Sequence, residues 1–302
     1  MIDFGSFKFS IVSDGTFWLD GGAMFGIVPK VLWNKLNPAD EFNRIELRLN
    51  CLLIKTPTEN ILVDTGVGEN LDNKFKEIYR VERDFGLIIA LEKIGIKPGD
   101  INFIINTHLH FDHCGGNTIK RAGKFVPTFP RAKYIIQKQE WLDATSPNER
   151  TKASYLEENF IPIEEAGQLL LVDGEHEVTS GIKVMVTDGH TRGHQSVIIE
   201  SDGKKAMYCG DLIPTTSHIK IPYIMGYDLF PLDIMEKKKE ILKKALQEHW
   251  LLIFEHDPKI PFAYLIEKNG KQILEPIENE IRNSKQIRMT KIQNSKKSSE
   301  FR

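Results

Sequence analysis

The decisive stretch of the sequence is residues 107–116, which read Thr107-His108-Leu109-His110-Phe111-Asp112-His113-Cys114-Gly115-Gly116. Three histidines and one aspartate fall within six residues, shortly after the apolar run at 101–105. A short apolar run of this kind predicts a buried strand. Crowding so many titratable groups beside a core costs desolvation and repulsion unless a cation offsets both. The stretch therefore predicts a metal site at the end of a strand.

The spacing divides these side chains into two pairs. Residues two apart in an extended chain point to the same side, so His108 and His110 can bind one ion together. Asp112 and His113 lie past the bend and can reach a second ion. Imidazole nitrogen and carboxylate oxygen suit zinc, with iron or manganese as alternatives. A lone His-x-His would more often be structural, and the density of ligands is what favours a metal centre here.

Around this stretch, the chain alternates strand and helix patterns without a linker or a detectable repeat. Strands are expected near 7–11, 47–53, 61–63, 101–105, 133–137, 182–186, 196–200, 205–208, 251–254 and 262–267. Helices are expected from Asp84 to residue 94 and over 233–248, where the lysines at 237–239 are expected to face water. Residues 20–43 predict a long irregular loop whose aromatic residues, Phe25 and Trp33 among them, look exposed.

The totals are those of an ordinary globular protein. A formal net charge of −2 over 302 residues gives no indication of a nucleic-acid partner. The apolar runs are too short to cross a bilayer, and no signal-peptide pattern follows Met1, so we expect a cytoplasmic protein without a membrane partner. Three widely spaced cysteines predict no disulfide framework. We expect one domain over 1–281 and a basic, polar, disordered tail over 282–302.

Residues 108–113 resemble the His-x-His-x-Asp-His signature of the metallo-β-lactamase-fold superfamily, and later motifs of that family follow in order from about residue 7 to about residue 270. Gly189-His190 resembles the third motif, Gly210-Asp211 the bridging carboxylate, and Glu255-His256 the last ligand. Asp64 resembles the early aspartate that orients a ligand histidine through its other nitrogen. The resemblance implies an α+β fold, an αββα four-layer sandwich with two mixed β-sheets flanked by helices. The metal ligands that it implies are His108, His110, Asp112, His113, His190, Asp211 and His256.

Such a site predicts a dinuclear hydrolase. Two divalent cations, expected to be zinc, would hold a bridging hydroxide that attacks an ester-like bond without a covalent enzyme intermediate. Asp112 and Asp211 are the carboxylates expected to accept and return the proton, which makes them the predicted catalytic groups. The run at 108–117 and the ending Gly193-His194-Gln195-Ser196 look most like the lactonase and methyl parathion hydrolase branch. The expected substrate is therefore a small molecule, a lactone, and His194 is expected to be a structural histidine beneath the site.

Two positions depart from the pattern of the family. Asp188 stands where many members have a proline, which adds a candidate hydrogen-bond acceptor beside the site. Pro214 stands where some lactonases have a tyrosine that helps bind the carbonyl, so Tyr223 or Tyr227 would have to reach the site instead. We expect residues 214–227 and the loop around Phe25 to form the substrate wall, although such aromatic residues often only pack loops down.

Alternative functions remain open on sequence alone. A phosphotriester or aryl ester hydrolase of the same fold would use the same ligands. A persulfide dioxygenase would use a single iron at His108, His190 and Asp211 and would not need His256. A flavin-linked diiron oxidoreductase would need an acidic residue in place of His110, and a binding protein without turnover would lack some of the ligands. A homodimer is one possible assembly.

Overall fold

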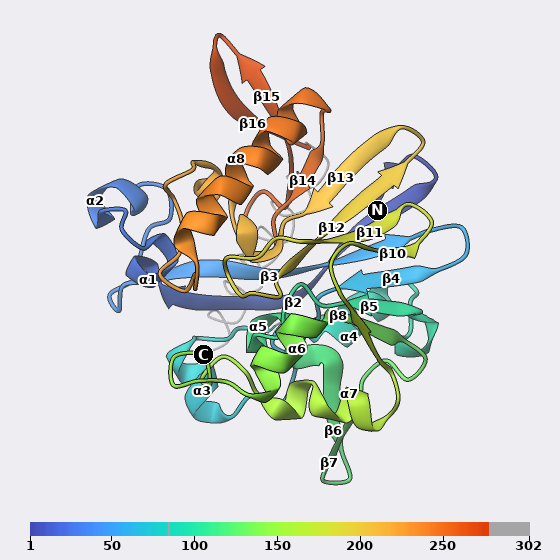
Figure 1. Cartoon of the computed structure of the whole chain (residues 1–302). Helices are drawn as coiled ribbons and strands as arrows, with labels where there is room; N and C mark the ends of the chain where they lie inside the picture. The colour runs from blue at the N-terminus through green and yellow to red at the C-terminus, as the bar shows by residue number, and fades with distance from the viewer. Residues whose placement is uncertain (84, 278–302) are drawn as a thin grey trace, which may run out of the picture.

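The computed structural model describes residues 1–83 and 85–277, and two facing β-sheets form its centre (Figure 1). The first sheet contains, in spatial order, β1 (Ile2–Phe4), β2 (Phe7–Asp20), β3 (Arg44–Lys55), β4 (Asn60–Val63), β5 (Phe103–Ile105), β8 (Lys133–Gln137) and β9 (Leu169–Val172). The second contains β10 (His176–Thr179), β11 (Ile182–Val186), β12 (Gln195–Ser201), β13 (Lys204–Tyr208), β14 (Leu251–Ile253), β15 (Phe262–Lys268) and β16 (Lys271–Pro276). Each sheet mixes parallel and antiparallel neighbours, as predicted.

Helices cover the outer face of each sheet (Figure 1). The longest, α8 (Pro231–Gln247), lies on the second sheet, whereas α4 (Gly86–Lys93), α6 (Lys138–Thr145) and α7 (Ile161–Glu165) lie on the side of the first sheet. Shorter helices are α1 (Gly21–Phe25), α2 (Lys30–Trp33), α3 (Asn73–Ile78) and α5 (Phe111–Cys114), and a hairpin of β6 (Thr118–Arg121) and β7 (Lys124–Pro127) completes the described fold. The four-layer αββα arrangement expected from the resemblance is confirmed.

The alternation of apolar side chains along the strands explains the layering. In β3, Leu52 and Ile54 join the core between the two sheets, while Leu53 joins the core beneath α4 and α6. In β12, Ile199 faces the first sheet and Ile198 faces α8. Successive side chains of a strand point to opposite faces, so central strands that are apolar at consecutive positions must be covered on both sides.

Residues 20–43 are more ordered than predicted. They contain α1 and α2, and Phe25 and Trp33 are buried at 0% and 1% exposure instead of facing solvent. The two rings stack with centroids 5.5 Å apart, and Phe25 also stacks on His218 at 4.5 Å. These aromatic side chains hold the loop against the body of the protein, since aromatic pairs bury a large apolar area.

The expectation that all the lysines at 237–239 face water is wrong for Lys238. Its side chain is fully buried, and Nζ donates to the carbonyl oxygens of His218, Lys220 and Tyr223 at 2.6–2.9 Å. Position 238 lies one helical turn after the buried Ile234, which places it on the face that α8 turns toward the sheet. Three carbonyl acceptors match the three donors of an ammonium group, which is how the fold accommodates a buried lysine.

Several predicted boundaries shift by a few residues. The strand expected over 101–105 is the shorter β5. The sequence did not predict β1, β6, β7, β9, β10 and β16. Asp84 and the predicted tail at 282–302 lie outside the described residues. The part of the chain that the structure describes contains no helix long and apolar enough to cross a membrane.

Candidate metal centre

The carboxyl ends of four strands meet at one edge of the sandwich and deliver the predicted ligands. In the first sheet, β4 runs parallel to β5, so Asp64 and the segment beginning at Thr107 follow neighbouring strand ends. In the second sheet, β13 runs parallel to β14, so Asp211 and His256 leave the same edge. Parallel strands collect the residues that follow them at one edge. His190, which follows β11, reaches the same place, and the seven predicted ligands lie together there.

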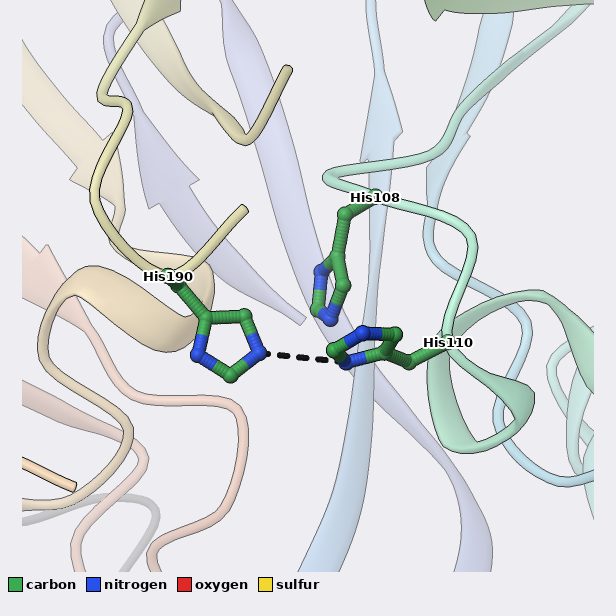
Figure 2. A group of neighbouring side chains, drawn as sticks. All are labelled: His108, His110 and His190. Atoms are coloured by element: carbon green, nitrogen blue, oxygen red, sulfur yellow. Dashed lines mark hydrogen bonds between the residues drawn. The ribbon is translucent and has the colours of Figure 1, made fainter. Parts of the chain in front are cut away.

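One group of three histidines comes from two distant segments (Figure 2). The ligand atoms of His108, His110 and His190 lie within 4.8 Å of one another. His110 Nδ1 and His190 Nε2 are 3.1 Å apart, and the ring of His108 completes the triangle. Three nitrogens at this spacing form the half-shell that a tetrahedral cation such as zinc requires.

A second group of the same size lies beside the first. It consists of Asp112, His113 and His256, whose ligand atoms also lie within 4.8 Å of one another. The Nε2 atoms of His113 and His256 are 3.2 Å apart, and Asp112 Oδ2 lies 3.7 Å from the first and 3.8 Å from the second. The sequence expectation of two adjacent ligand sets matches this placement.

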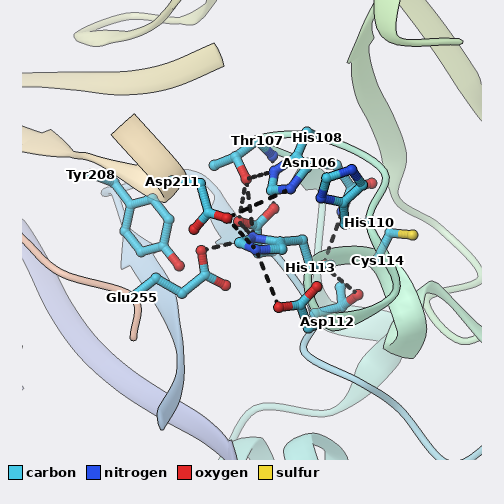
Figure 3. Close-up of polar contacts among 12 residues, drawn as sticks. Asn106, Thr107, His108, His110, Asp112, His113, Cys114, Tyr208, Asp211 and Glu255 are labelled. Atoms are coloured by element: carbon cyan, nitrogen blue, oxygen red, sulfur yellow. Dashed lines mark hydrogen bonds and ion pairs between the residues drawn. The ribbon is translucent and has the colours of Figure 1, made fainter. Parts of the chain in front are cut away.

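The Asp211 carboxylate contacts both groups, and Figure 3 shows it beside the rings of His108 and His113. Its Oδ2 is 3.1 Å from His190 Nε2 and 3.6 Å from His113 Nε2, and its Oδ1 is 3.3 Å from His256 Nε2. A carboxylate with one oxygen near each group can contact two cations at once, which is the geometry of a dinuclear site.

The burial of the site provides a test of whether cations fit it. His108, His113, His190 and His256 are at most 2% exposed, yet His108 Nε2 and Asp211 Oδ1 have no hydrogen-bond partner among the described residues. Buried polar atoms are rarely left unpaired, because losing water without a replacement costs free energy. Both orphaned atoms point into the cluster, so two cations would satisfy them.

Two groups of the cluster, His108 and Asp211, have the charge state that metal binding requires. Burial, and then the positive potential of the neighbouring His113 and His110, lower the pKa of His108 well below its usual range, which keeps the imidazole neutral as a metal ligand must be. Burial would raise the pKa of Asp211, but the imidazoles of His190 and His113 outweigh burial and hold that pKa well below its usual range. Asp211 is therefore a carboxylate at neutral pH.

Asp64 supports the site from behind, as the sequence predicted. It accepts hydrogen bonds from the main-chain N–H and the hydroxyl of Thr107, both at 2.7 Å, and its Oδ2 lies 3.1 Å from His113 Nδ1. Glu255 Oε2 lies 2.9 Å from the same nitrogen. The direction of the His113 Nδ1–H bond nevertheless makes Asp64 its hydrogen-bond acceptor. Asp64 also has a left-handed backbone, with φ 55°, a strained conformation that occurs where the surrounding structure fixes a side chain.

His194 is structural, as expected. Its Nε2 accepts the main-chain N–H of Asp211 at 3.0 Å, and its Nδ1 donates to the Thr187 hydroxyl at 2.8 Å. Burial lowers the pKa of His194 to about 3, so the ring stays neutral. The chain can pass over this ring because Gly210, at φ 52°, has no side chain to collide with it.

Two further carboxylates contact the ligand loops and were not identified from the sequence. Glu140 in α6 accepts the N–H of Leu109 and the hydroxyls of Tyr155 and Thr191, which joins the segment of His108 to that of His190. Asp228 accepts from His190 Nδ1 at 2.9 Å. The candidate acceptor Asp188, by contrast, is exposed. Both missed residues lie far along the chain from the histidines, and no local pattern marks them.

A pocket of about 190 Å³ opens onto the cluster. Tyr79 and Tyr227 line it, whereas Tyr223 packs its ring edge against Phe25. Of the two tyrosines proposed to replace the one missing at Pro214, only Tyr227 therefore lines the pocket. The other lining residues are Leu19, Met24, His110, Phe111, Asp112, Arg150, Thr151, Ser154, His190, Asp211, Met225, Gly226, Leu229 and His256.

Comparisons with known proteins point to one family. The sequence profile described as "Metallo-beta-lactamase superfamily" matches residues 45–256. An N-acyl homoserine lactonase of Bacillus cereus is 29% identical over 229 residues, 71% of this chain and 83% of that protein. The N-acyl homoserine lactonase AiiA of Bacillus thuringiensis subsp. kurstaki is 30% identical over 227 residues, 70% of this chain and 82% of that protein.

Solved structures agree on the fold. A probable metal-dependent hydrolase from Staphylococcus aureus superimposes with a TM-score of 0.85 and 31% identity, over 92% of this chain and 99% of that one. The dizinc quorum-quenching lactonase AidC, in complex with the product N-hexanoyl-L-homoserine, superimposes with a TM-score of 0.75 over 91% of this chain and 96% of that one. At 24% identity, the latter likeness shows the fold alone.

Proposed function

This chain belongs to the metallo-beta-lactamase superfamily and is a metal-dependent hydrolase, and from that premise we propose that it opens lactone rings at a dinuclear metal centre. One observation carries the proposal. Two triads of buried ligand-type side chains share the single carboxylate Asp211 at the floor of a pocket. Zinc is the proposed metal, because neutral imidazole and carboxylate ligands suit it.

We assign one cation to His108, His110 and His190 and the other to Asp112, His113 and His256, with Asp211 shared by both. The unpaired His108 Nε2 and Asp211 Oδ1 support this assignment, since each would gain the partner that it lacks in the fold. The set uses the seven ligands expected from the sequence, and iron or manganese are the alternative occupants.

When bound, two such cations supply an activated water nucleophile near neutral pH and polarise the carbonyl group under attack. The protein supplies position and proton transfer. Asp112 and Asp211 both line the pocket, so their carboxylates can take the proton of the attacking water and return it to the ring oxygen as the lactone opens. The apolar side chains of Met24, Phe111 and Met225 can hold the rest of the substrate and exclude water.

The lactonase relatives favour a lactone over other esters. N-acyl homoserine lactones are the first compounds to test, because the curated relatives are named for them. Lactone opening releases one proton at neutral pH, so initial rates can be followed with a pH indicator. We expect turnover of a medium-chain acyl lactone, loss of that turnover in His110→Ala, and full turnover in His249→Ala, where the changed histidine is exposed.

Turnover of an aryl ester or a phosphotriester, with lactone hydrolysis only at the background rate, would contradict the lactone assignment. It would favour the second candidate function, a phosphotriester or aryl ester hydrolase of the same fold. A mononuclear-iron persulfide dioxygenase is the third candidate. Its single iron would leave Asp112, His113 and His256 without a role, although these three side chains form a complete triad in the fold.

We also propose that the catalytic unit is one domain over 1–281 and that two copies associate. Support for a homodimer comes from apolar side chains on the loop that contains α2, where Ile27 is 81% and Val31 72% exposed. Exposed apolar clusters mark interaction surfaces. Light scattering on a sizing column should give twice the chain mass, and paired substitutions to aspartate at these two positions should give a monomer.

A further inference from the structure

A buried carboxylate lies behind His190, on the side away from the other histidines. Asp228 Oδ1 accepts from His190 Nδ1 at 2.9 Å, and the two side chains are each 1% exposed. Because a carboxylate can only accept here, Nδ1 carries a proton, and Nε2 is the nitrogen left to bind a metal. Nε2 faces His110 Nδ1, 3.1 Å away, and Asp211 Oδ2, also 3.1 Å away.

The contact repeats, on the other triad, the arrangement at His113. There, Asp64 Oδ2 lies behind Nδ1 at 3.1 Å. Two other ligand histidines have neutral partners at Nδ1, the Thr107 hydroxyl for His108 and the Arg48 carbonyl for His256. The Nδ1 atom of His110 faces the cluster itself. Each proposed cation thus has one histidine that is backed by a carboxylate.

Asp228 belongs to the wall of the pocket. Its second oxygen, Oδ2, accepts the main-chain N–H of Met225 at 2.8 Å, and the next residue, Leu229, donates its N–H to the His190 carbonyl at 3.1 Å. Arg150, which also lines the pocket, donates to the carbonyls of Gly226 at 3.1 Å and Asp228 at 3.2 Å. The wall segment 225–229 and the loop of His190 are therefore one hydrogen-bonded unit.

We propose that Asp228 is a positioning residue that fixes the tautomer and orientation of His190 as a metal ligand and ties that ligand to the substrate wall. The inference rests on the proposed metal-binding role of His190. A carboxylate behind a ligand imidazole raises the basicity of the ligating nitrogen, and losing such a partner costs about 10–100-fold in metal affinity. Asp188 cannot take this role, since its side chain is exposed.

The test compares Asp228→Asn with Asp188→Asn in the full chain. The first variant keeps the size of the side chain but removes its charge, and the second removes a charge two residues from His190 without touching the ring. Zinc dissociation constants from competition with a chromophoric chelator should rise about 10–100-fold for one of two ions in Asp228→Asn. They should stay within twofold of the unmodified protein in Asp188→Asn.

The unmodified protein provides a measurement that does not depend on the folding of a variant. In zinc-loaded protein with ¹⁵N-labelled histidine, His190 Nδ1 should be protonated and Nε2 metal-bound. An unprotonated His190 Nδ1 would overturn the inference. So would an Asp228→Asn variant that only raises KM and holds both ions with unchanged affinity, which is the result for a residue that shapes the wall alone. Unmodified protein that binds fewer than two ions would refute the proposed function itself.

Discussion

Replacing Glu140 with alanine should loosen the metal centre from outside it. The Glu140 carboxylate is fully buried in α6 and accepts from Leu109 N at 2.9 Å, from the Tyr155 hydroxyl at 3.1 Å and from the Thr191 hydroxyl. Leu109 lies between the proposed ligands His108 and His110, and Thr191 follows His190. One side chain thus connects the two segments of a single triad.

The magnitude follows from these three contacts. A hydrogen bond to a charged group contributes about 1.5–3 kcal/mol, so the three together contribute roughly 5–9 kcal/mol before desolvation. Burial is the largest influence on this carboxyl and raises its pKa, and the cost of removing the charge from water offsets several kcal/mol. We expect Glu140→Ala to lower the free energy of unfolding by about 3–5 kcal/mol, and Glu140→Gln to lower it by about 1–2 kcal/mol.

Urea unfolding of chelator-treated protein measures this effect without a contribution from bound metal. Gln139→Ala is the matched control, because Gln139 is the exposed neighbour on the same helix and should change stability by no more than about 0.5 kcal/mol. Glu140→Ala should also retain less metal than Gln139→Ala after dialysis. A Glu140→Ala variant destabilised by less than about 1 kcal/mol, with metal retained, would refute the reasoning.

Three other perturbations have defined outcomes. Lys238→Met should lower the free energy of unfolding by about 2–4 kcal/mol in urea, because three carbonyl oxygens lose their donor, and an unchanged midpoint would contradict that role. Arg150→Ala should raise KM several-fold while both ions are retained, since the exposed guanidinium holds only the pocket wall, and metal loss would be the contrary result. Burial lowers the pKa of His218 to about 3 in the folded protein, whereas the unfolded chain takes up the proton near 6.5. Stability should therefore fall below about pH 6.5 by up to about 1.4 kcal/mol per pH unit, and His218→Gln should show a correspondingly shallower dependence in urea titrations. Equal slopes would contradict this assignment.

The sequence revealed those parts of the site that are local or marked by spacing. His108, His110, Asp112 and His113 fall within six residues after a strand, and their convergence with Asp211 follows once parallel strands end at one edge. Asp64 and Asp211 were identified because they resemble the early aspartate and the bridging carboxylate of the family. The order of these motifs along the chain was enough to expect the residues together.

Other parts could not be predicted because they depend on tertiary contacts between distant segments. Asp228 and Glu140 contact the ligand loops only after α6 and the 225–229 segment have packed. Lys238 reads as one of a run of solvent-facing lysines, and only the loop folded over α8 supplies the carbonyls that pair it. Phe25 likewise became a core residue because His218 and Trp33 come from different segments to stack on it.

Elemental analysis of freshly purified protein tests the central claim most directly. The account predicts about two divalent ions per chain, zinc foremost, and about one fewer in His256→Ala, which would lose one complete triad. His176→Ala, where the changed histidine is exposed, should keep both. A single iron per chain that is unaffected by His256→Ala, together with oxygen uptake on a persulfide, would contradict the dinuclear hydrolase.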